Sequence, residues 1–240
     1  MGKTACVTGA DRGLGLALTK GLLEEGYRVA AGKYGSDDSD ALSELKGRYG
    51  DRLLTVRMDV SSDSSVKEAA RSIASFADSI DLLINNAAIL GDISRTVDDE
   101  LDYEEMLRVF NVNALGALRV NNALLPLILR STLKFIMNIS SEAGSIGDCY
   151  RNNWFAYAMS KSALNMQTAL LHNHLRDTGA LALSVHPGWV QSYMQGKLDA
   201  GATYTPDQAA GHLIALARSP ERFRADKPMF VDLLGDPLPW

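Results

Sequence analysis

Short apolar runs alternate with segments of helical periodicity along the whole of this chain. The apolar runs predict strands near 3–8, 28–32, 53–58, 81–85, 133–139, 181–186 and 229–232. The helical pattern recurs near 14–25, 38–48, 63–76, 100–129, 155–177 and 206–218, and Pro126 is expected to kink or end the fourth helix. This alternation predicts an α/β fold, a single Rossmann-type doubly wound parallel sheet of about seven strands with helices on both faces.

Composition bounds the class of protein. With 240 residues, 46% of them hydrophobic, the chain can bury one large core, so we expect a single domain over residues 1–240. The net charge is −5 and no run of basic residues occurs, which argues against a nucleic-acid partner. Uninterrupted apolar runs such as 123–129 fall far short of the ~20 residues of a membrane span. No secretory signal precedes the first strand, so we expect a soluble, cytoplasmic protein without a membrane partner.

The cysteines and histidines do not predict a metal site. Cys6 and Cys149 are too few and too far apart in sequence for a disulfide framework or a zinc site. His172 and His174 are two positions apart on a predicted helix, which directs their rings to different faces. We therefore expect no metal.

A glycine-rich turn follows the first predicted strand. Gly9, Gly13 and Gly15 surround Asp11, Arg12 and Leu14, at the point where the next helix begins. Glycines in this place let backbone amides and the positive end of a helix approach a pyrophosphate. Leu14 occupies the place of the second glycine of a P-loop, which excludes that motif, whereas an ordinary strand-to-helix turn remains an alternative.

The ends of the second and third strands bear on the choice of nucleotide. Lys33 ends the second strand and Arg12 lies in the glycine turn, and positive charge there favours the 2′-phosphate of NADP(H) over NAD(H), which stays possible. Lys33 could instead be a solvated surface lysine. Asp59, followed by Val60, is placed either to accept from an adenine amino group or to cap the next helix.

Tyr157 and Lys161 are four positions apart, so a helix would bring a phenol and an ammonium onto one face. A free tyrosine has a pKa near ~10, and a fixed neighbouring cation lowers that pKa by favouring phenolate. The pair therefore predicts a proton donor and acceptor. Combined with a nucleotide turn, it suggests carbonyl reduction by hydride transfer.

Taken together, these motifs resemble the short-chain dehydrogenase/reductase family over essentially the whole chain. The resemblance rests on Thr8 to Gly15, Asp59, Asn85 to Ala88, Asn113, Ser140–Ser141 and Tyr157 to Lys161, in that order and spacing. It implies an oxidoreductase that acts on CH–OH groups with NAD(P) as acceptor. The segment His186 to Ser192 and the C-terminal Gly235 to Trp240 resemble the C-signal-like and carbonyl-reductase-like subgroup.

The resemblance also implies roles for single residues. Tyr157 would be the general acid or base, and Lys161 would lower its pKa and bind the nicotinamide ribose. Ser141 would donate to the carbonyl oxygen, and Asn113 would hold a water that links Lys161 to solvent, with Asn111 as the competing candidate. Further cofactor contacts are implied at the following positions: Asn86, Ala87, Pro187, Gly188 and Val190.

Other inferences concern the substrate and the partners. Ser141 and Tyr157 are farther apart than is usual in the family, so we expect an extra loop within 148–154. Trp154, Trp189, Tyr193 and Met194 suggest an apolar pocket without an arginine clamp, suited to small neutral carbonyl or alcohol substrates. The apolar faces of 100–129 and 155–177 predict a homodimer or homotetramer.

Two alternatives to such an enzyme remain. A nucleotide-binding signalling or sensor protein of the C-signal type, with little or no turnover, would keep the cofactor cradle, although it would not need a tuned phenol. Epimerase or dehydratase chemistry on nucleotide sugars is disfavoured, because little chain follows the sixth strand.

Overall fold

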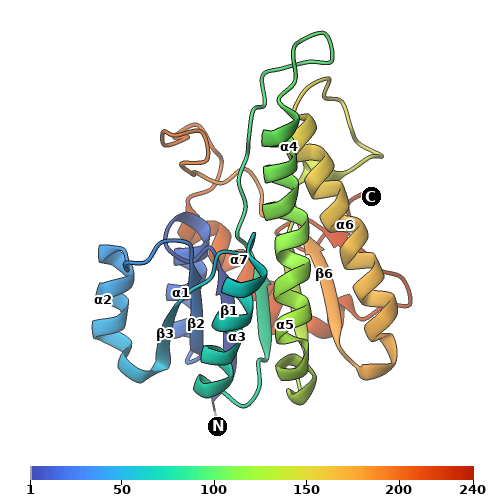
Figure 1. Cartoon of the computed structure of the whole chain (residues 1–240). Coiled ribbons are helices and arrows are strands. Elements are labelled where there is room, and N and C mark those ends of the chain that lie inside the picture. Colours follow the sequence, from blue (N-terminus) through green and yellow to red (C-terminus); the bar gives the residue numbers. More distant parts are fainter. Residues whose placement is uncertain (1) are drawn as a thin grey trace.

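The computed structural model describes residues 2–240, and its centre is one parallel sheet (Figure 1). The seven strands lie in the order β3-β2-β1-β4-β5-β6-β7, and every neighbouring pair is parallel. Their bounds are Thr4–Thr8 (β1), Arg28–Lys33 (β2), Leu53–Arg57 (β3), Leu82–Asn85 (β4), Phe135–Ile139 (β5), Leu181–Val185 (β6) and Met229–Val231 (β7). The predicted doubly wound α/β fold is confirmed.

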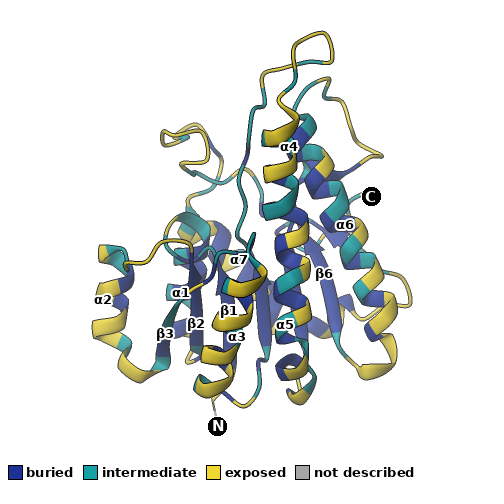
Figure 2. Ribbon diagram, viewed as in Figure 1, coloured by how far each residue is buried: buried dark blue, intermediate teal, exposed yellow. Residues whose placement is uncertain are grey.

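Helices cover both faces of this sheet. One core cluster joins the sheet to α1 (Gly13–Glu24), α2 (Asp40–Tyr49) and α7 (Pro206–Arg218). A second cluster joins the opposite face to α3 (Asp63–Phe76), α5 (Gly116–Arg130) and the end of α6 (Phe155–Leu175). Every residue of β1, β4, β5 and β6 is buried, and β1 and β6 are dark in Figure 2, so these strands are mostly apolar on both faces and do not alternate.

The long helical pattern of the sequence forms three consecutive segments. Asp102 caps α4 (Tyr103–Phe110) by accepting from the backbone N–H of Glu105, so the helix begins three residues later than predicted. A π-helical turn (Asn111–Leu115) then leads directly into α5. This turn lies beside the candidate site, where such irregularities are frequent.

Pro126 does not end α5, which contradicts that part of the prediction, because the helix continues to Arg130. Pro126 and Asn122 are both exposed, so the carbonyl left without a proline N–H faces solvent, where water can bind it. Leu124, Leu127 and Ile128 are buried and hold the last turns against the sheet.

The combined stretch Tyr103–Arg130 is long and apolar enough, by length and composition, to cross a bilayer, and half of its most apolar window is buried inside the protein. The sequence expectation considered only uninterrupted apolar runs, which are shorter. In the fold, α4 packs against α6, and α5 packs against α3 and β4. A core helix passes the same test of length and composition.

Candidate active site

The glycine turn lies at the carboxyl end of β1, where α1 begins. Gly9 has a positive φ of 64°, and a Cβ there would come within 2.9 Å of the Ala87 backbone. At Gly15 a Cβ would meet the Gly9 carbonyl oxygen at 2.0 Å, so only glycine fits. The first turn of α1 carries no acidic side chain, and Arg12 makes no side-chain cap. The glycines thus let the backbone of the turn pack tightly at the start of α1, and no carboxylate of the first turn offsets the positive end of the helix. Both features suit the binding of a pyrophosphate.

Asn86 and Ala87 tie the end of β4 to this turn. The Asn86 side-chain amide donates to the carbonyl oxygens of Thr8 and Gly9, at 2.9 and 3.1 Å. The Thr8 hydroxyl oxygen accepts from the backbone N–H groups of Asn86 and Ala87, both at 3.0 Å. These bonds fix the floor of the crevice next to the glycine turn.

Lys33 is a buried, paired cation, so the view that it is a solvated surface lysine is wrong. Its side chain is 6% exposed, and its Nζ lies 2.9 Å from Asp38 Oδ1 and also donates to the Ser36 carbonyl oxygen. Thr55 donates to the other Asp38 oxygen at 3.0 Å. Arg12, in the glycine turn, is exposed. The sequence indicated Lys33 but gave no sign that Asp38 offsets its charge.

Asp59 closes a turn and does not cap α3. Its Oδ1 accepts from the backbone N–H and the hydroxyl of Ser61, at 2.9 and 2.6 Å. The N-cap of α3 is Ser62, which accepts from the N–H of Ser65. Val60 is buried against Gly116 of α5. A role of Asp59 or Val60 toward adenine stays a prediction.

Tyr157 and Lys161 lie buried on the first turns of α6, at the end of β5. Lys161 Nζ donates to the Ile139 carbonyl oxygen at 2.7 Å and lies 5.5 Å from the centre of the Tyr157 ring. Burial lowers the pKa of Lys161 to about 7. The predicted juxtaposition of phenol and amine is therefore present.

The groups of the protein alone do not lower the pKa of Tyr157, which contradicts the prediction made from Lys161. Burial, first, and the Glu142 carboxylate, second, raise the pKa of Tyr157 above its ordinary value, and Ser141 and Arg151 only partly oppose them. The sequence argument considered the ammonium of Lys161 but not the cost of burying a phenolate beside a carboxylate. The protein's own groups thus keep the phenol protonated.

Ser141 begins the short 3₁₀ turn Glu142–Gly144 (η3) that follows β5. Its hydroxyl donates to Glu142 Oε2 at 2.7 Å and accepts from the N–H of Ala143 at 3.1 Å. Glu142 also pairs with Arg151 and lies 3.6 Å from His186 Nδ1. Arg151 comes from the extra loop, so the structure brings an arginine to the site where the sequence suggested none.

Asn113 lies in the π-helical turn, and its side chain acts as a tie. Its Oδ1 accepts from the N–H of Ile89 and its Nδ2 donates to the Ile89 carbonyl oxygen, both at 2.8 Å. Nδ2 also donates to the hydroxyl of Ser160, which in turn donates to the Tyr157 carbonyl oxygen. Asn113 therefore holds the first turn of α6 in place. Asn111, the competing candidate, donates only to the Ser61 carbonyl oxygen at 3.4 Å.

The segment after β6, from Pro187 to Leu198, begins at the same sheet edge as the glycine turn. Gly188 has a φ of 78°, and a Cβ there would meet the Tyr204 ring at 2.8 Å. Pro187 is buried, and Val190 pairs with Tyr204 in an isolated parallel bridge. The residues that follow, Tyr193, Met194 and Leu198, are exposed apolar side chains. They form the short segment of the chain between Val190 and α7.

The topology collects these groups because the strands are parallel and their carboxyl ends meet at one edge of the sheet. The glycine turn, Asn86, Ser141, Tyr157 and Lys161 share that edge. The backbone cradle fits a dinucleotide, and the buried phenol, hydroxyl and amine fit proton transfer to a substrate oxygen. Sequence reasoning missed Glu142, Arg151 and Asp38, although the long Ser141-to-Tyr157 spacing was a signal for Arg151.

Comparisons with known proteins agree with this arrangement. The family model described as short chain dehydrogenase matches residues 3–203. The chain is 37% identical to the C-signal protein of Myxococcus xanthus over 162 residues, which are 67% of this chain and 93% of that protein.

Two solved structures share the fold over the whole chain. NADPH-bound carbonyl reductase from chicken fatty liver has a TM-score of 0.87 at 29% identity, covering 100% of this chain and 94% of its own. A short-chain dehydrogenase/reductase from Burkholderia multivorans with bound NADP has a TM-score of 0.88 at 25% identity, covering 100% of both chains. This chain therefore belongs to the short-chain dehydrogenase/reductase family of oxidoreductases, as the family match, the relative and the shared fold establish together with the arrangement of Ser141, Tyr157 and Lys161.

Proposed function

We propose that this protein is an NADP(H)-dependent oxidoreductase that interconverts a small carbonyl compound and its alcohol. The observation that carries the proposal is the buried Tyr157 phenol with Lys161 Nζ 5.5 Å from its ring centre, next to Ser141 and at the same sheet edge as the glycine turn. A phenol is a strong enough acid to protonate an alkoxide-like oxygen, and burial excludes the water that would compete with the substrate.

In reduction, Tyr157 gives its proton to the substrate oxygen as the carbonyl π bond breaks and a new C–H bond forms. The reduced cofactor, when bound, supplies the hydride for that C–H bond. Lys161, held by the Ile139 carbonyl oxygen, stabilises the phenolate that remains. Because the chain's own groups raise the pKa of Tyr157, the phenol is protonated at neutral pH and ready to donate. Ser141 would donate its hydroxyl proton to the substrate oxygen after turning from Glu142.

The preference for NADP(H) is supported by Arg12 and Lys33 beside the glycine turn, and by the two similar structures with NADPH or NADP bound. Asp38 offsets the charge of Lys33, so Arg12 is the cation better placed to meet a 2′-phosphate. The substrate would be small and largely neutral, because the exposed side chains of the segment after β6, such as Tyr193 and Met194, are apolar.

The test is a turnover screen with purified protein. NADPH and NADH are first titrated by fluorescence, and a panel of aldehydes and ketones is then screened with the better cofactor. We expect tighter binding of NADPH and carbonyl-dependent oxidation of it. A protein that binds NADPH but is silent over the whole panel would instead support the sensor alternative, which similarity to the C-signal protein keeps in view. Tighter binding of NADH would overturn the cofactor assignment.

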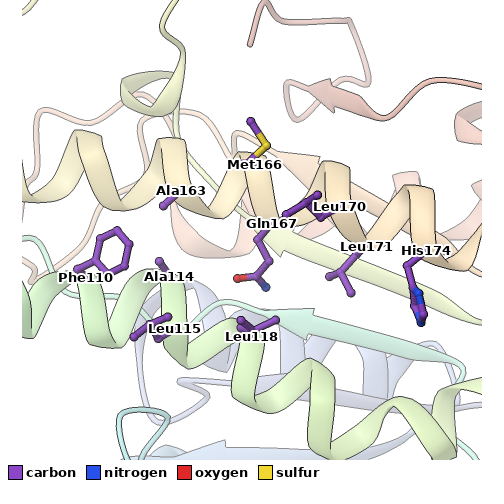
Figure 3. Close-up of a pocket in the computed structure, with 10 residues that line it drawn as sticks. All are labelled: Phe110, Ala114, Leu115, Leu118, Ala163, Met166, Gln167, Leu170, Leu171 and His174. Atoms are coloured by element: carbon purple, nitrogen blue, oxygen red, sulfur yellow. The ribbon is translucent and has the colours of Figure 1, made fainter.

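We also propose that the protein is a homo-oligomer through an apolar groove, here the α5–α6 groove, between α6 and the continuous run of the end of α4, the π-helical turn and the start of α5 (Figure 3). The groove has a volume of about 410 Å³, and Leu115, Leu118, Met166 and Leu170 at its edges are exposed. These side chains repeat at helical spacing on both helices, so a twofold axis would pair each stripe with its copy. Light scattering at micromolar concentration should give at least a dimer; a monomer would refute this proposal.

A further inference from the structure

The carboxylate of Glu142 lies at the centre of a polar group that the catalytic scheme above does not use. Ser141 donates to its Oε2 at 2.7 Å, Arg151 donates to its Oε1, and His186 Nδ1 lies 3.6 Å away. Burial alone would raise the pKa of Glu142, but the Ser141 bond and the charges of His186 and Arg151 outweigh it, so that its pKa is lowered. Glu142 is therefore a carboxylate at neutral pH.

Arg151 is held firmly against this carboxylate. Its side chain is only 13% exposed, and its guanidinium lies 4.5 Å from the centre of the Tyr150 ring and 4.8 Å from that of Trp154. Trp154 in turn makes an edge contact with Tyr157, with ring centres 6.0 Å apart. The extra loop thus delivers a fixed cation to the catalytic end of α6.

The charged groups facing Tyr157 and Glu142 come from four elements. Glu142 raises the pKa of Tyr157 and Arg151 lowers it, while Lys161 lies beside the ring. His186, directly after β6, also faces Asp232. Burial lowers the pKa of His186 below its ordinary value of 6.5, so its ring is neutral at neutral pH. Arg151 is consequently the permanent counter-ion of Glu142.

We propose that Glu142 and Arg151 are a positioning pair for the reaction: Glu142 holds the Ser141 hydroxyl until a substrate oxygen replaces it as acceptor, and Arg151 from the loop 148–154 balances the negative charge that Glu142 presents to Tyr157. This inference rests on the proposed function, because it assigns the pair an effect on proton transfer at Tyr157. It also explains what the extra residues between Ser141 and Tyr157 contribute, namely the counter-ion that keeps this carboxylate compatible with a catalytic phenol.

The two members of the pair have opposite effects on the phenol, which makes the inference testable. In Glu142→Gln the negative charge is gone and the phenol loses its proton more easily. In Arg151→Met the carboxylate is left without its cation and the phenol holds its proton more strongly. In the double variant both charges are absent, so the two effects cancel.

The measurement is kcat/KM for alcohol oxidation as a function of pH, a direction in which Tyr157 must first lose its proton. Relative to the wild type, the apparent pKa of the rising limb should fall by about one unit in Glu142→Gln and rise by about one unit in Arg151→Met. The double variant should return to within a few tenths of a unit of the wild type. Arg151→Lys, which keeps the charge, should largely restore the limb.

Glu25 and Arg218 provide a matched control, because they form an ion pair between the end of α1 and α7, away from the site. Glu25→Gln and Arg218→Met should leave the limb unchanged. Two results would show a purely structural role and overturn the inference. In the first, both single variants lose kcat equally with no change in the apparent pKa of the rising limb. In the second, that apparent pKa moves in the same direction in both single variants.

A second readout does not depend on turnover. In protein with ¹³C-labelled glutamate carboxyls, the Glu142 signal is assigned by its loss in Glu142→Gln and followed with pH. Arg151→Met should raise the titration midpoint of Glu142 by about one unit. An unchanged midpoint would refute the ion pair even in a protein without turnover, whereas a raised midpoint in a silent protein would show that only the proposed function fails.

Discussion

Gly15→Ala tests the claim that the glycine turn is a closely packed cofactor cradle. The added Cβ would lie 2.0 Å from the Gly9 carbonyl oxygen and 2.6 Å from the Asn86 side-chain nitrogen. The first of these atoms is backbone, so the clash can be relieved only by moving β1 and α1 apart. That movement would also widen the crevice floor that Asn86 holds together.

The expected magnitude follows from two opposing effects. Overpacking of this kind costs about 1–3 kcal/mol, whereas alanine is favoured over glycine inside a helix by about 1 kcal/mol. The net loss of unfolding free energy should be up to about 2 kcal/mol, which lowers Tm by up to about 8 °C in a domain of this size. Because backbone amides move away from the phosphates, Kd for NADPH should also rise at least about tenfold, or about 1.4 kcal/mol.

Scanning calorimetry and NADPH fluorescence titration measure both effects. Gly47→Ala is the matched control, because Gly47 is an exposed glycine of α2 where an added Cβ meets nothing within 4 Å. It should leave NADPH binding unchanged and raise Tm by about 2–4 °C, from up to about 1 kcal/mol of helix propensity. The reasoning is refuted if Gly15→Ala is as stable as Gly47→Ala and binds NADPH like the wild type.

Three further predictions concern charge and assembly. The pKa of Lys161 is about 7 in the folded chain and 10.5 ordinarily, so between these pH values the unfolded state binds more protons than the folded state. The free energy of unfolding should therefore rise from pH 7 to pH 9. Chemical denaturation at each pH should show this rise in the wild type and not in Lys161→Met. Asp38→Asn frees the charge of Lys33, so NADPH should bind about tenfold more tightly while NADH changes little, and equal effects on both cofactors would count against the assignment. Met166→Asp places a charge in the α5–α6 groove and should convert the oligomer to a monomer in light scattering, with NADPH affinity retained; an intact oligomer would show that the groove is not the interface.

The fold was predictable because strongly periodic, apolar segments determine it. All seven predicted strands and the predicted helices are present within a few residues, since β1, β4, β5 and β6 are buried on both faces and are therefore mostly apolar. The end of α5 was less predictable. Whether a proline breaks a helix depends on whether the freed carbonyl can reach water, and Pro126 and Asn122 are both exposed.

The site was predictable where a local spacing fixes the geometry, as for Tyr157 and Lys161 on one helix turn. It was not predictable where loops bring charges together. The pairing of Glu142 with Arg151 depends on the path of the extra loop, and that of Lys33 with Asp38 depends on the chain turning back after β2. Asp38 offsets the charge of Lys33, whereas burial, first, and the Glu142 carboxylate, second, raise the pKa of Tyr157, which is why the predicted direction of that pKa was wrong.

The most direct test of the account compares Tyr157→Phe with the wild type at saturating NADPH, on whichever carbonyl substrate the screen gives. Phenylalanine keeps the buried ring beside Trp154 and removes only the hydroxyl group whose proton the mechanism uses. We expect kcat to fall by at least about 10²-fold, with Kd for NADPH changed by less than about fivefold. A Tyr157→Phe protein that turns over within a few-fold of the wild type would contradict the assignment of Tyr157 as the proton donor.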